Sequence, residues 1–354
     1  MTTPSSSSSA FGVSPLPPGS GPERIHGYAW AFAASRALAT ALELSLFNRI
    51  ARGSATVAEL SRAAGASERG MAMLLDALVA MGLVAREGSG RAARHALATD
   101  ADLFLVEGRD GYIGDFALVH DRSIRPNWDR LAECVRSGEP VAAVDRPEEG
   151  DALWQELVGT LLTVNRGAAR AAAEELARLH TGPLRILDVA AGSGVWGIAA
   201  ARARPDVRVV AFDLASTLEI TRRTVEREGL AERIELAAGD LREADLGREA
   251  YEAAILGHIL HSEGPKHSRR LLAKVARALV PGGTVVIAEF VPDSDRGGPL
   301  LPVLFALNML VHTSEGTTFT LRELEGMLGE AGFDEVRTLA APAPSPLVLA
   351  TRRR

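Results

Sequence analysis

Apolar positions in the first third of the chain recur at helical spacing, with short interruptions. After a long first helix, a second one is predicted to begin at Thr56, because Glu59 three residues later completes the pattern of a capping box. A third helix and two short strands around the Gly-Ser-Gly segment 88–90 follow. We therefore predict a mainly helical winged helix-turn-helix domain over residues 23–105.

The apolar pattern changes further along the chain, where short apolar runs alternate with helical segments. Residues 106–164 are predicted to form a helical linker and substrate-pocket region. From 165 to 354 the alternation predicts an α/β domain with a Rossmann-like, parallel, doubly wound sheet. A late helix is predicted to begin at Thr320, capped together with Glu323. The expected strands are 185–189, 207–212, 234–237, 253–256, 284–288, 335–339 and 347–351.

Composition and charge narrow the classes of partner. The chain has 354 residues, of which 47% are apolar, and this is enough for two domains with buried cores. A net charge of -6 argues against a nucleic-acid footprint spread over the whole protein. Within residues 24–105, nine Arg stand against seven acidic residues, a small excess that is weak for binding phosphates. A dimerisation module is therefore favoured over a DNA-binding one, and no nucleic-acid partner is expected.

The ends of the chain and its cysteine content bear on localisation. Residues 1–22 are rich in Ser, Pro and Gly and are predicted to be a disordered tail. Cys134 is the single cysteine, so no intrachain disulfide can form, which suits a reducing compartment. We expect no signal peptide, because a basic segment followed by an apolar one is missing, and no bilayer-spanning run. A cytoplasmic protein without a membrane partner is expected.

A strand, a glycine-rich turn and a helix start are predicted for the segment ILDVAAGSGVWG, residues 186–197. Glycines and the free N–H groups of a helix N-terminus let a ligand approach the backbone closely. Asp213, at the end of the next strand, is placed to bind ribose hydroxyls. Because Gly192, Gly194 and Gly197 also fit G-x-G-x-x-G, a dinucleotide is an alternative ligand.

Three segments resemble motifs of the class I methyltransferases that use S-adenosylmethionine (SAM): LDVAAGSG (187–194), AGDL (238–241) and LLAKVARALVPGGTVVIAE (271–289). The carboxylate of Asp188 suits the cationic ammonium of SAM and would repel a pyrophosphate. With the winged-helix domain in front, the chain resembles the small-molecule O-methyltransferases typified by the caffeate and isoflavone enzymes. The resemblance implies a SAM site made of Asp188, Ala190, Gly192, Gly194, Asp213, Leu214, Gly239, Asp240, Leu241 and Gly257.

The same resemblance implies an activity and its catalytic residues. A hydroxyl or enol of a small secondary metabolite would be methylated, and the N-terminal domain would form a homodimer. The segment GHILHSEG (257–264) places His261 at the position of the family's general base, and Glu289 matches the Glu that flanks it. A His with a pKa near 6.5 is a suitable proton acceptor at neutral pH.

The chain departs from the family pattern at several positions around the base. Ser262 and Glu263 replace the family's Asp and Trp after the His. Thr318 stands at a second family Glu, and Thr313 stands at a substrate-facing Asn. The pair of acidic residues around the base is therefore half retained.

Several alternatives stay open at this point. Because His261 and His312 both fall on pocket positions by the resemblance, they could ligate a metal for C-methylation of a 2-oxo acid enol. Other chemistry on bound SAM and a winged-helix, ligand-sensing regulator are further alternatives. His258 and His267 are interpreted as surface or capping residues. The candidate substrate-contacting residues are Trp154, Asn308, Met309 and His312, with Phe116, Trp128 and Phe305 as further apolar-pocket candidates.

Overall fold

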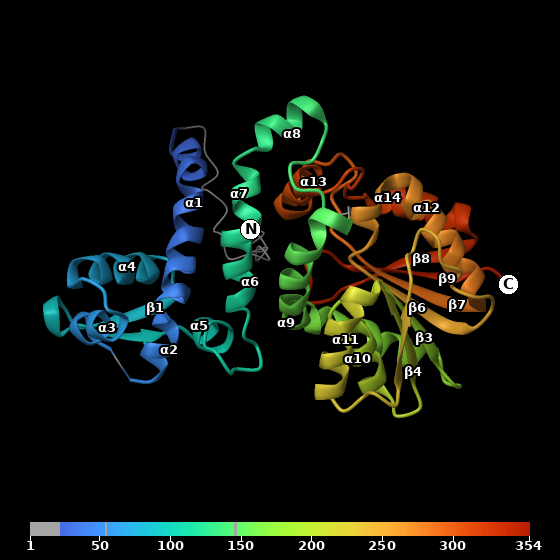
Figure 1. Ribbon diagram of the computed structural model, residues 1–354, viewed down its shortest axis with the longest axis horizontal. Coiled ribbons are helices and arrows are strands. Elements are labelled where there is room, and N and C mark those ends of the chain that lie inside the picture. The colour runs from blue at the N-terminus through green and yellow to red at the C-terminus, as the bar shows by residue number, and fades with distance from the viewer. Residues whose placement is uncertain (1–21, 54, 145–146) are drawn as a thin grey trace, which may run out of the picture. The chain divides into compact units, whose positions relative to one another are not determined.

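A computed structural model of the protein describes residues 22–53, 55–144 and 147–354, without the side chains of Arg91 and of residues 147–154. The tail predicted to be disordered lies, as far as residue 21, outside the described residues. The chain forms two compact units, one ending at Arg125 and the other beginning at Pro126 (Figure 1). The division between the units falls inside the segment predicted to be a linker.

The N-terminal unit contains the predicted winged helix. The Thr56 hydroxyl accepts the N–H of Glu59 while the Glu59 carboxylate accepts the N–H of Thr56, which confirms the capping box. The antiparallel strands β1 and β2 follow the third helix of the motif. The elements of this unit are α1 (Pro22–Glu43), α2 (Leu46–Ala51), α3 (Val57–Ala64), α4 (Glu68–Ala80), β1 (Val84–Glu87), the 3₁₀ turn Gly90–Ala92, β2 (Arg94–Leu97), α5 (Thr99–Phe104), α6 (Gly114–Val119) and the π-helical turn His120–Ile124.

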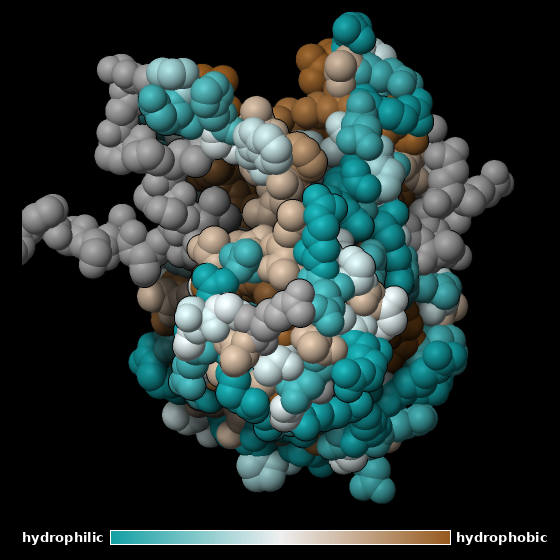
Figure 2. Space-filling view, turned by 90° about the vertical axis from the view of Figure 1, so that its left-hand side faces the viewer, coloured by the Kyte–Doolittle hydropathy of each residue, from teal (hydrophilic) through white to brown (hydrophobic). Residues whose placement is uncertain are grey.

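The core of this unit is apolar, and its surface carries both hydrophobic and hydrophilic side chains. Leu46, Phe47 and Leu75 are buried in a cluster formed by the helices around β1. Figure 2 shows hydrophobic residues interspersed with hydrophilic ones on the face turned toward the viewer. Four large apolar or aromatic side chains of α1 are exposed, which are Ile25, Tyr28, Trp30 and Phe32.

The C-terminal unit is built around a seven-stranded sheet with the order β5-β4-β3-β6-β7-β9-β8. The pairs from β5 to β7 are parallel, as the sequence predicts. The elements are α7 (Arg125–Trp128), α8 (Leu131–Ser137), α9 (Pro147–Leu179), β3 (Arg185–Val189), α10 (Val195–Ala203), β4 (Arg208–Asp213), α11 (Ala215–Arg227), β5 (Ile234–Ala238), β6 (Tyr251–Gly257), α12 (Leu260–Ala278), β7 (Leu279–Ala288), α13 (Leu300–His312), α14 (Leu321–Ala331), β8 (Phe333–Leu339) and β9 (Leu347–Arg352).

Helices cover both faces of this sheet (Figure 1). Alternate residues of one strand point to opposite faces, so Ile186 packs with α9 and α10 whereas Leu187 packs with α12 and α14. Because both faces are buried, the central strands are nearly continuous apolar runs.

The last strand departs from the all-parallel pattern. β9 lies between β7 and β8 and is antiparallel to both of them. The segment 340–346 that joins β8 to β9 contains no helix. A connection this short cannot make the crossover that a parallel pair requires, so the two strands form a hairpin.

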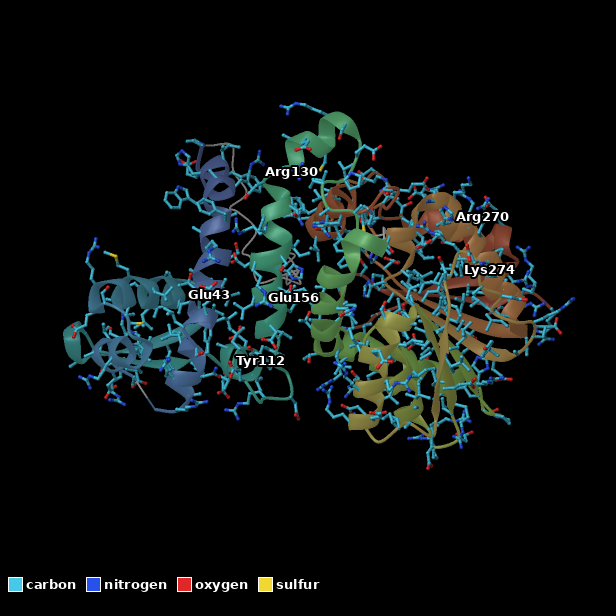
Figure 3. All side chains as sticks on the ribbon, in the orientation of Figure 1. Glu43, Tyr112, Arg130, Glu156, Arg270 and Lys274 are labelled. Carbon is cyan, nitrogen blue, oxygen red and sulfur yellow. The ribbon has the colours of Figure 1, made fainter. Side chains whose placement is uncertain are left out.

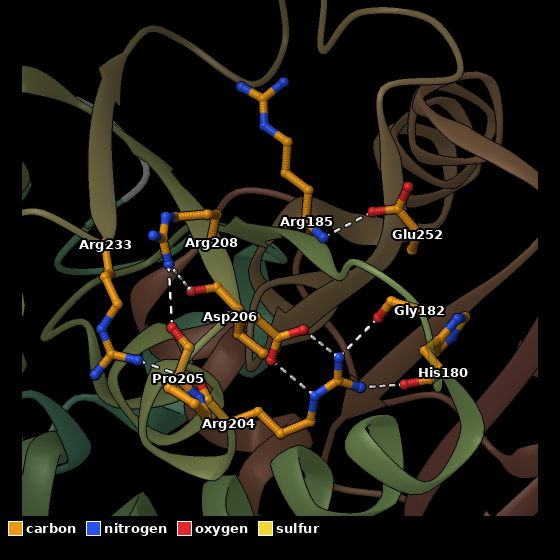
Figure 4. A network of polar contacts seen from close by, with 10 residues as sticks. His180, Gly182, Arg185, Arg204, Pro205, Asp206, Arg208, Arg233 and Glu252 are labelled. Carbon is orange, nitrogen blue, oxygen red and sulfur yellow. Dashed lines mark hydrogen bonds and ion pairs between the residues drawn. The ribbon is translucent and has the colours of Figure 1, made fainter.

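An arginine network fixes the end of the sheet where β3 and β4 begin (Figure 4). The guanidinium of Arg204 donates to the carbonyl oxygens of His180 and Gly182 and pairs with the Asp206 carboxylate. Arg233 donates to the carbonyl of Arg204 from the start of β5. These contacts tie together the connections that enter the strands.

The predicted cap of α14 is also confirmed, and it gives a stability prediction. Thr320 and Glu323 form a reciprocal capping box, and Arg296 pairs with the Glu323 carboxylate. We expect Thr320→Ala to lower the free energy of unfolding by about 1 kcal/mol, because one N–H of the first turn loses its acceptor. Thr320→Ser keeps the hydroxyl and is the matched control in urea unfolding. Equal losses in the two variants would assign the effect to the methyl group instead.

Among the described residues, no helix has both the length and the apolar character needed to cross a membrane.

Candidate active site

The carboxyl ends of the parallel strands define where a ligand site can form. After β3 the chain adds β4 and β5 on one side, and it then returns to add β6 and β7 on the other side. In open α/β sheets, ligands bind outside the carboxyl ends of the strands at such a reversal. Here that position lies between β3 and β6.

The glycine loop after β3 is held by its neighbours at this reversal. Gly192 and Gly194 adopt left-handed backbone conformations, with φ of 54° and 79°, which residues with side chains rarely adopt. The N–H of Gly192 donates to Oδ2 of Asp213, at 2.8 Å, and the Thr221 hydroxyl donates to the carbonyl of Gly192, at 2.7 Å. The loop is therefore fixed against the end of β4 and the helix α11.

Asp188 supports this loop from within the protein. Its side chain is fully buried, and Oδ2 accepts the N–H of Gly197 in α10 at 2.8 Å. Its Oδ1 is shielded and lacks a hydrogen-bond partner among the described residues. Burial raises the pKa of Asp188 to about 8, although the bond from Gly197 opposes this shift. Burial also raises the pKa of Asp213, against the bonds that it accepts from Gly192 and Leu214.

The segment after β5 contacts Asp213, the residue that also binds the glycine loop. The N–H of Gly239 donates to the carbonyl of Asp213, and a Cβ at Gly239 would lie 2.7 Å from the Phe212 ring. Asp240 accepts the N–H of Arg242 and so forms a tight turn. Lys274, labelled in Figure 3, lies on α12. Its ammonium donates to the Leu241 carbonyl at 2.7 Å. The structure thus brings Gly239 beside Asp213.

Gly257 at the end of β6 has a steric explanation. A Cβ at this position would lie 2.0 Å from Nε1 of Trp196. The Trp196 indole therefore fills the space beside this position, and only glycine fits there.

A buried His–Glu pair lies at the carboxyl ends of β6 and β7. Nδ1 of His261 lies 2.7 Å from Oε2 of Glu289, and the His261 backbone N–H donates to Oε1 at 3.2 Å. The exposed fractions of the two side chains are 11% and 2%. Burial opposes ionisation of Glu289, but the charge of His261 and the hydrogen bonds from it outweigh burial and lower the pKa of Glu289. An ionised carboxylate only accepts, so Nδ1 carries the proton and Nε2 is left as the basic nitrogen.

The backbone of His261 is held by the segment after α13. The N–H of Thr317 donates to the His261 carbonyl at 2.8 Å, and the N–H of Gly316 donates to the Thr313 hydroxyl at 3.0 Å. A Cβ at Gly316 would lie 2.6 Å from the His261 carbonyl oxygen and 2.2 Å from Oγ1 of Thr313. Thr318 is buried beside this contact, and its hydroxyl is without a partner among the described residues.

Aromatic rings surround the pair. Phe290 and Phe305 stack with their centroids 3.8 Å apart, and Phe305 and His261 meet edge to face with their centroids 4.9 Å apart. His258 lies 6.1 Å from His261 and 5.3 Å from Phe290, measured between ring centroids. His258, interpreted from the sequence as a surface or capping residue, is half-buried, and its Nδ1 is shielded inside this aromatic group. The sequence signal that could have identified it is its spacing of three residues from His261 at the end of a strand.

The other predicted substrate residues lie on α13 or on α9. Asn308 accepts the indole N–H of Trp128 at 3.0 Å, and Met309 is buried. Both ring nitrogens of His312 are engaged, with the Asn308 carbonyl and with Asn127. Among the described residues, the group spaced for a metal is His258, His261 and Glu289, and it does not include the alternative pair of His261 with His312. The side chain of Trp154 lies outside the described part of the protein.

Comparison with known proteins identifies the family. Residues 154–334 match the O-methyltransferase domain, and residues 27–107 match the O-methyltransferase dimerisation domain. The chain is 33% identical over 342 residues to the tetracenomycin polyketide synthesis 8-O-methyl transferase TcmO of Streptomyces glaucescens, covering 94% of this chain and 98% of the relative. The chain belongs to the SAM-dependent small-molecule O-methyltransferase family.

Two further known proteins are similar to this chain over most of its length. The 3-hydroxy-5-methyl-1-naphthoate 3-O-methyltransferase of Streptomyces sahachiroi is 32% identical, covering 88% of this chain and 89% of its own. Human N-acetylserotonin methyltransferase, solved in complex with SAM, superposes with a TM-score of 0.82 at 24% identity, covering 93% and 97% of the two chains, and shows the shared fold. These findings confirm the predicted methyltransferase, its fold and its SAM cofactor, and they support the dimerisation module over a DNA-binding one.

Proposed function

We propose that this methyltransferase methylates a phenolic or enolic hydroxyl of a small aromatic secondary metabolite, with His261 as general base. The observation that carries the proposal is the buried bond of 2.7 Å between Nδ1 of His261 and Glu289. It leaves Nε2 free to accept the proton of the hydroxyl as the oxygen attacks the methyl carbon. Glu289 then stabilises the imidazolium, as orienting carboxylates do beside other catalytic histidines.

The residues of the glycine loop and of its neighbours fit a SAM site. When bound, SAM supplies a methyl group activated by its sulfonium. Gly192, Gly194 and Ala190 would let it approach the backbone, while Asp213 and Leu214 would hold its ribose. Asp188 would support the site from beneath the loop, where its Oδ1 lacks a partner among the described residues. The remaining contacts are assigned to Gly239, Asp240, Leu241 and Gly257.

This assignment gives a pH prediction for the ligand-free protein. Because the folded chain holds the Asp188 proton more tightly than the unfolded chain, with a pKa of about 8 against 3.8, stability falls as the pH rises between these values. Asp188→Asn keeps an oxygen for the N–H of Gly197 but cannot ionise. We expect its unfolding midpoint in calorimetry to depend less on pH in that window.

Asp213 provides an internal control for this comparison, because it is present in both proteins. The pKa of Asp213 is also raised by burial and contributes the same trend in both proteins. Parallel midpoint curves for the wild type and Asp188→Asn would mean that Asp188 does not titrate in the folded state.

The relatives bear on which acceptor is methylated, and the N-terminal unit bears on whether the protein forms a homodimer. TcmO acts in tetracenomycin polyketide synthesis, and the Streptomyces sahachiroi relative methylates a hydroxynaphthoate, so we infer a fused-ring phenol as the acceptor. We infer a homodimer through the N-terminal unit, because α1 exposes four large apolar or aromatic side chains within the matched dimerisation domain.

Two measurements test the proposed function. Calorimetric titration should show binding of SAM, and mass spectrometry of reactions with hydroxynaphthoates should show products heavier by one methylene unit. Absence of SAM binding would contradict the cofactor site, and methylation on carbon would contradict the assignment to a hydroxyl.

A further inference from the structure

The proposed chemistry uses His261 and Glu289 but leaves a second imidazole unexplained. His258 lies three residues before the base, and one nitrogen or oxygen atom of each of His258, His261 and Glu289 lies within 4.8 Å of the others. Its ring lies between Trp196, at 6.2 Å, and Phe290, at 5.3 Å, measured between centroids. The fold therefore places a polar ring within the aromatic surroundings of the base.

The backbone at His258 holds this ring in place at some conformational cost. Its φ is 63°, in the left-handed region that residues with side chains rarely adopt. The His258 N–H donates to the Ala288 carbonyl at 2.9 Å, which anchors the residue to the end of β7. Strained conformations of this kind cluster at functional sites.

The imidazole is neutral and incompletely satisfied. Burial lowers the pKa of His258 to about 4, and the neighbouring His261 lowers it further against the opposing effect of Glu289. Nδ1 is shielded and has no hydrogen-bond partner among the described residues. A buried polar atom without a partner costs about 1–3 kcal/mol, and a phenylalanine would fill a similar space without that cost, so packing alone does not explain a histidine here.

Glu289 does not satisfy Nδ1 of His258: its two oxygens accept from the backbone and the ring of His261, and Nδ1 of His258 has no partner among the described residues. A small molecule with two neighbouring oxygens could instead reach both imidazoles at once, since hydrogen bonds from nitrogen to oxygen span about 2.7–3.2 Å. This inference rests on the proposed O-methylation, and it concerns how the acceptor is oriented.

We propose that His258 binds a second oxygen of the acceptor, adjacent to the hydroxyl that is methylated at His261. The acceptor class is an aromatic or enolised compound with two oxygens in ortho or peri positions. His258 is then a specificity-determining residue that chooses which hydroxyl faces the base.

The test compares two coumarins that differ by a single hydroxyl. Esculetin has two adjacent hydroxyls, and umbelliferone has only one. In the presence of S-adenosylhomocysteine, we expect the wild type to bind esculetin about tenfold more tightly, the order of one hydrogen bond. In His258→Phe, which keeps an aromatic ring without nitrogen, the two dissociation constants should become equal, whereas His258→Gln should recover part of the preference.

Controls separate this inference from the proposed function. The ratio of the two dissociation constants within one variant cancels a general change in folding, and His267→Phe on α12 should keep the wild-type ratio. An unchanged ratio in His258→Phe, or no preference in the wild type, overturns the inference.

Loss of the wild-type preference after a chelator also overturns it, because His258 would then serve a metal. Failure to bind S-adenosylhomocysteine contradicts the proposed function alone, since the coumarin ratio can be measured without it.

Discussion

Replacing His261 with glutamine is expected to lower turnover by roughly 10²–10⁴-fold, the range that a positioned general base contributes. The glutamine amide can still donate to the buried Glu289 carboxylate, so the variant avoids leaving an unpaired buried charge. Alanine would leave that charge without a partner and would confuse lost chemistry with lost stability. Affinity for SAM should stay near the wild-type value, because His261 is not among the residues assigned to the cofactor.

The measurement is single-turnover methylation of a hydroxynaphthoate across a range of pH, with SAM affinity from calorimetry. The wild-type rate should depend on pH, because a general base accepts a proton only in its unprotonated form, and the variant should lose this dependence. If His261→Gln keeps wild-type turnover, positioning of the acceptor suffices and the base assignment is wrong.

The second large effect is expected at Gly316, which lies outside the catalytic pair. A Cβ there would approach the His261 carbonyl oxygen at 2.6 Å and the Thr313 hydroxyl at 2.2 Å, so one of these groups must move. We expect Gly316→Ala to lower the free energy of unfolding by about 1–3 kcal/mol, as overpacking does. We also expect turnover to fall roughly 10²-fold, because a shift of the base by about 1 Å can cost that much.

Gly326→Ala is the matched control. Gly326 lies in α14, and a Cβ added there meets nothing within 4 Å. This substitution should leave turnover unchanged and should be neutral or stabilising, since alanine favours helix more than glycine does. Equal activity losses in the two variants would show that α14, and not the contact with His261, transmits the effect.

Local signals in the sequence predict much of the fold. The capping boxes at Thr56 and Thr320 involve residues three positions apart, so the sequence alone specifies them. The strand at 185–189 is bounded as predicted, and the glycine loop that follows it has the expected turn. These features depend on neighbours in the chain.

The environment of the base depends on residues far apart in the sequence, and the sequence predicts it less well. The hydrogen bond from the N–H of Thr317 to the His261 carbonyl joins segments separated by more than fifty positions. The spacing of apolar residues along the chain does not predict such a contact. The exclusion of any side chain at Gly257 depends on where Trp196 packs across the sheet. The burial of Nδ1 of His258 likewise depends on Phe290, which belongs to another strand end.

The place of β9 in the sheet imposes an order on folding. β7 and β8 form no pair with each other, and β9, which follows both in the chain, joins them on its two sides. Until Leu347–Arg352 is in position, β7 and β8 each present an open edge that can pair with another chain. The methyltransferase unit is therefore most exposed to aggregation while its last strand is still unpaired, and a nascent chain at that stage depends on rapid closure of the β8–β9 hairpin.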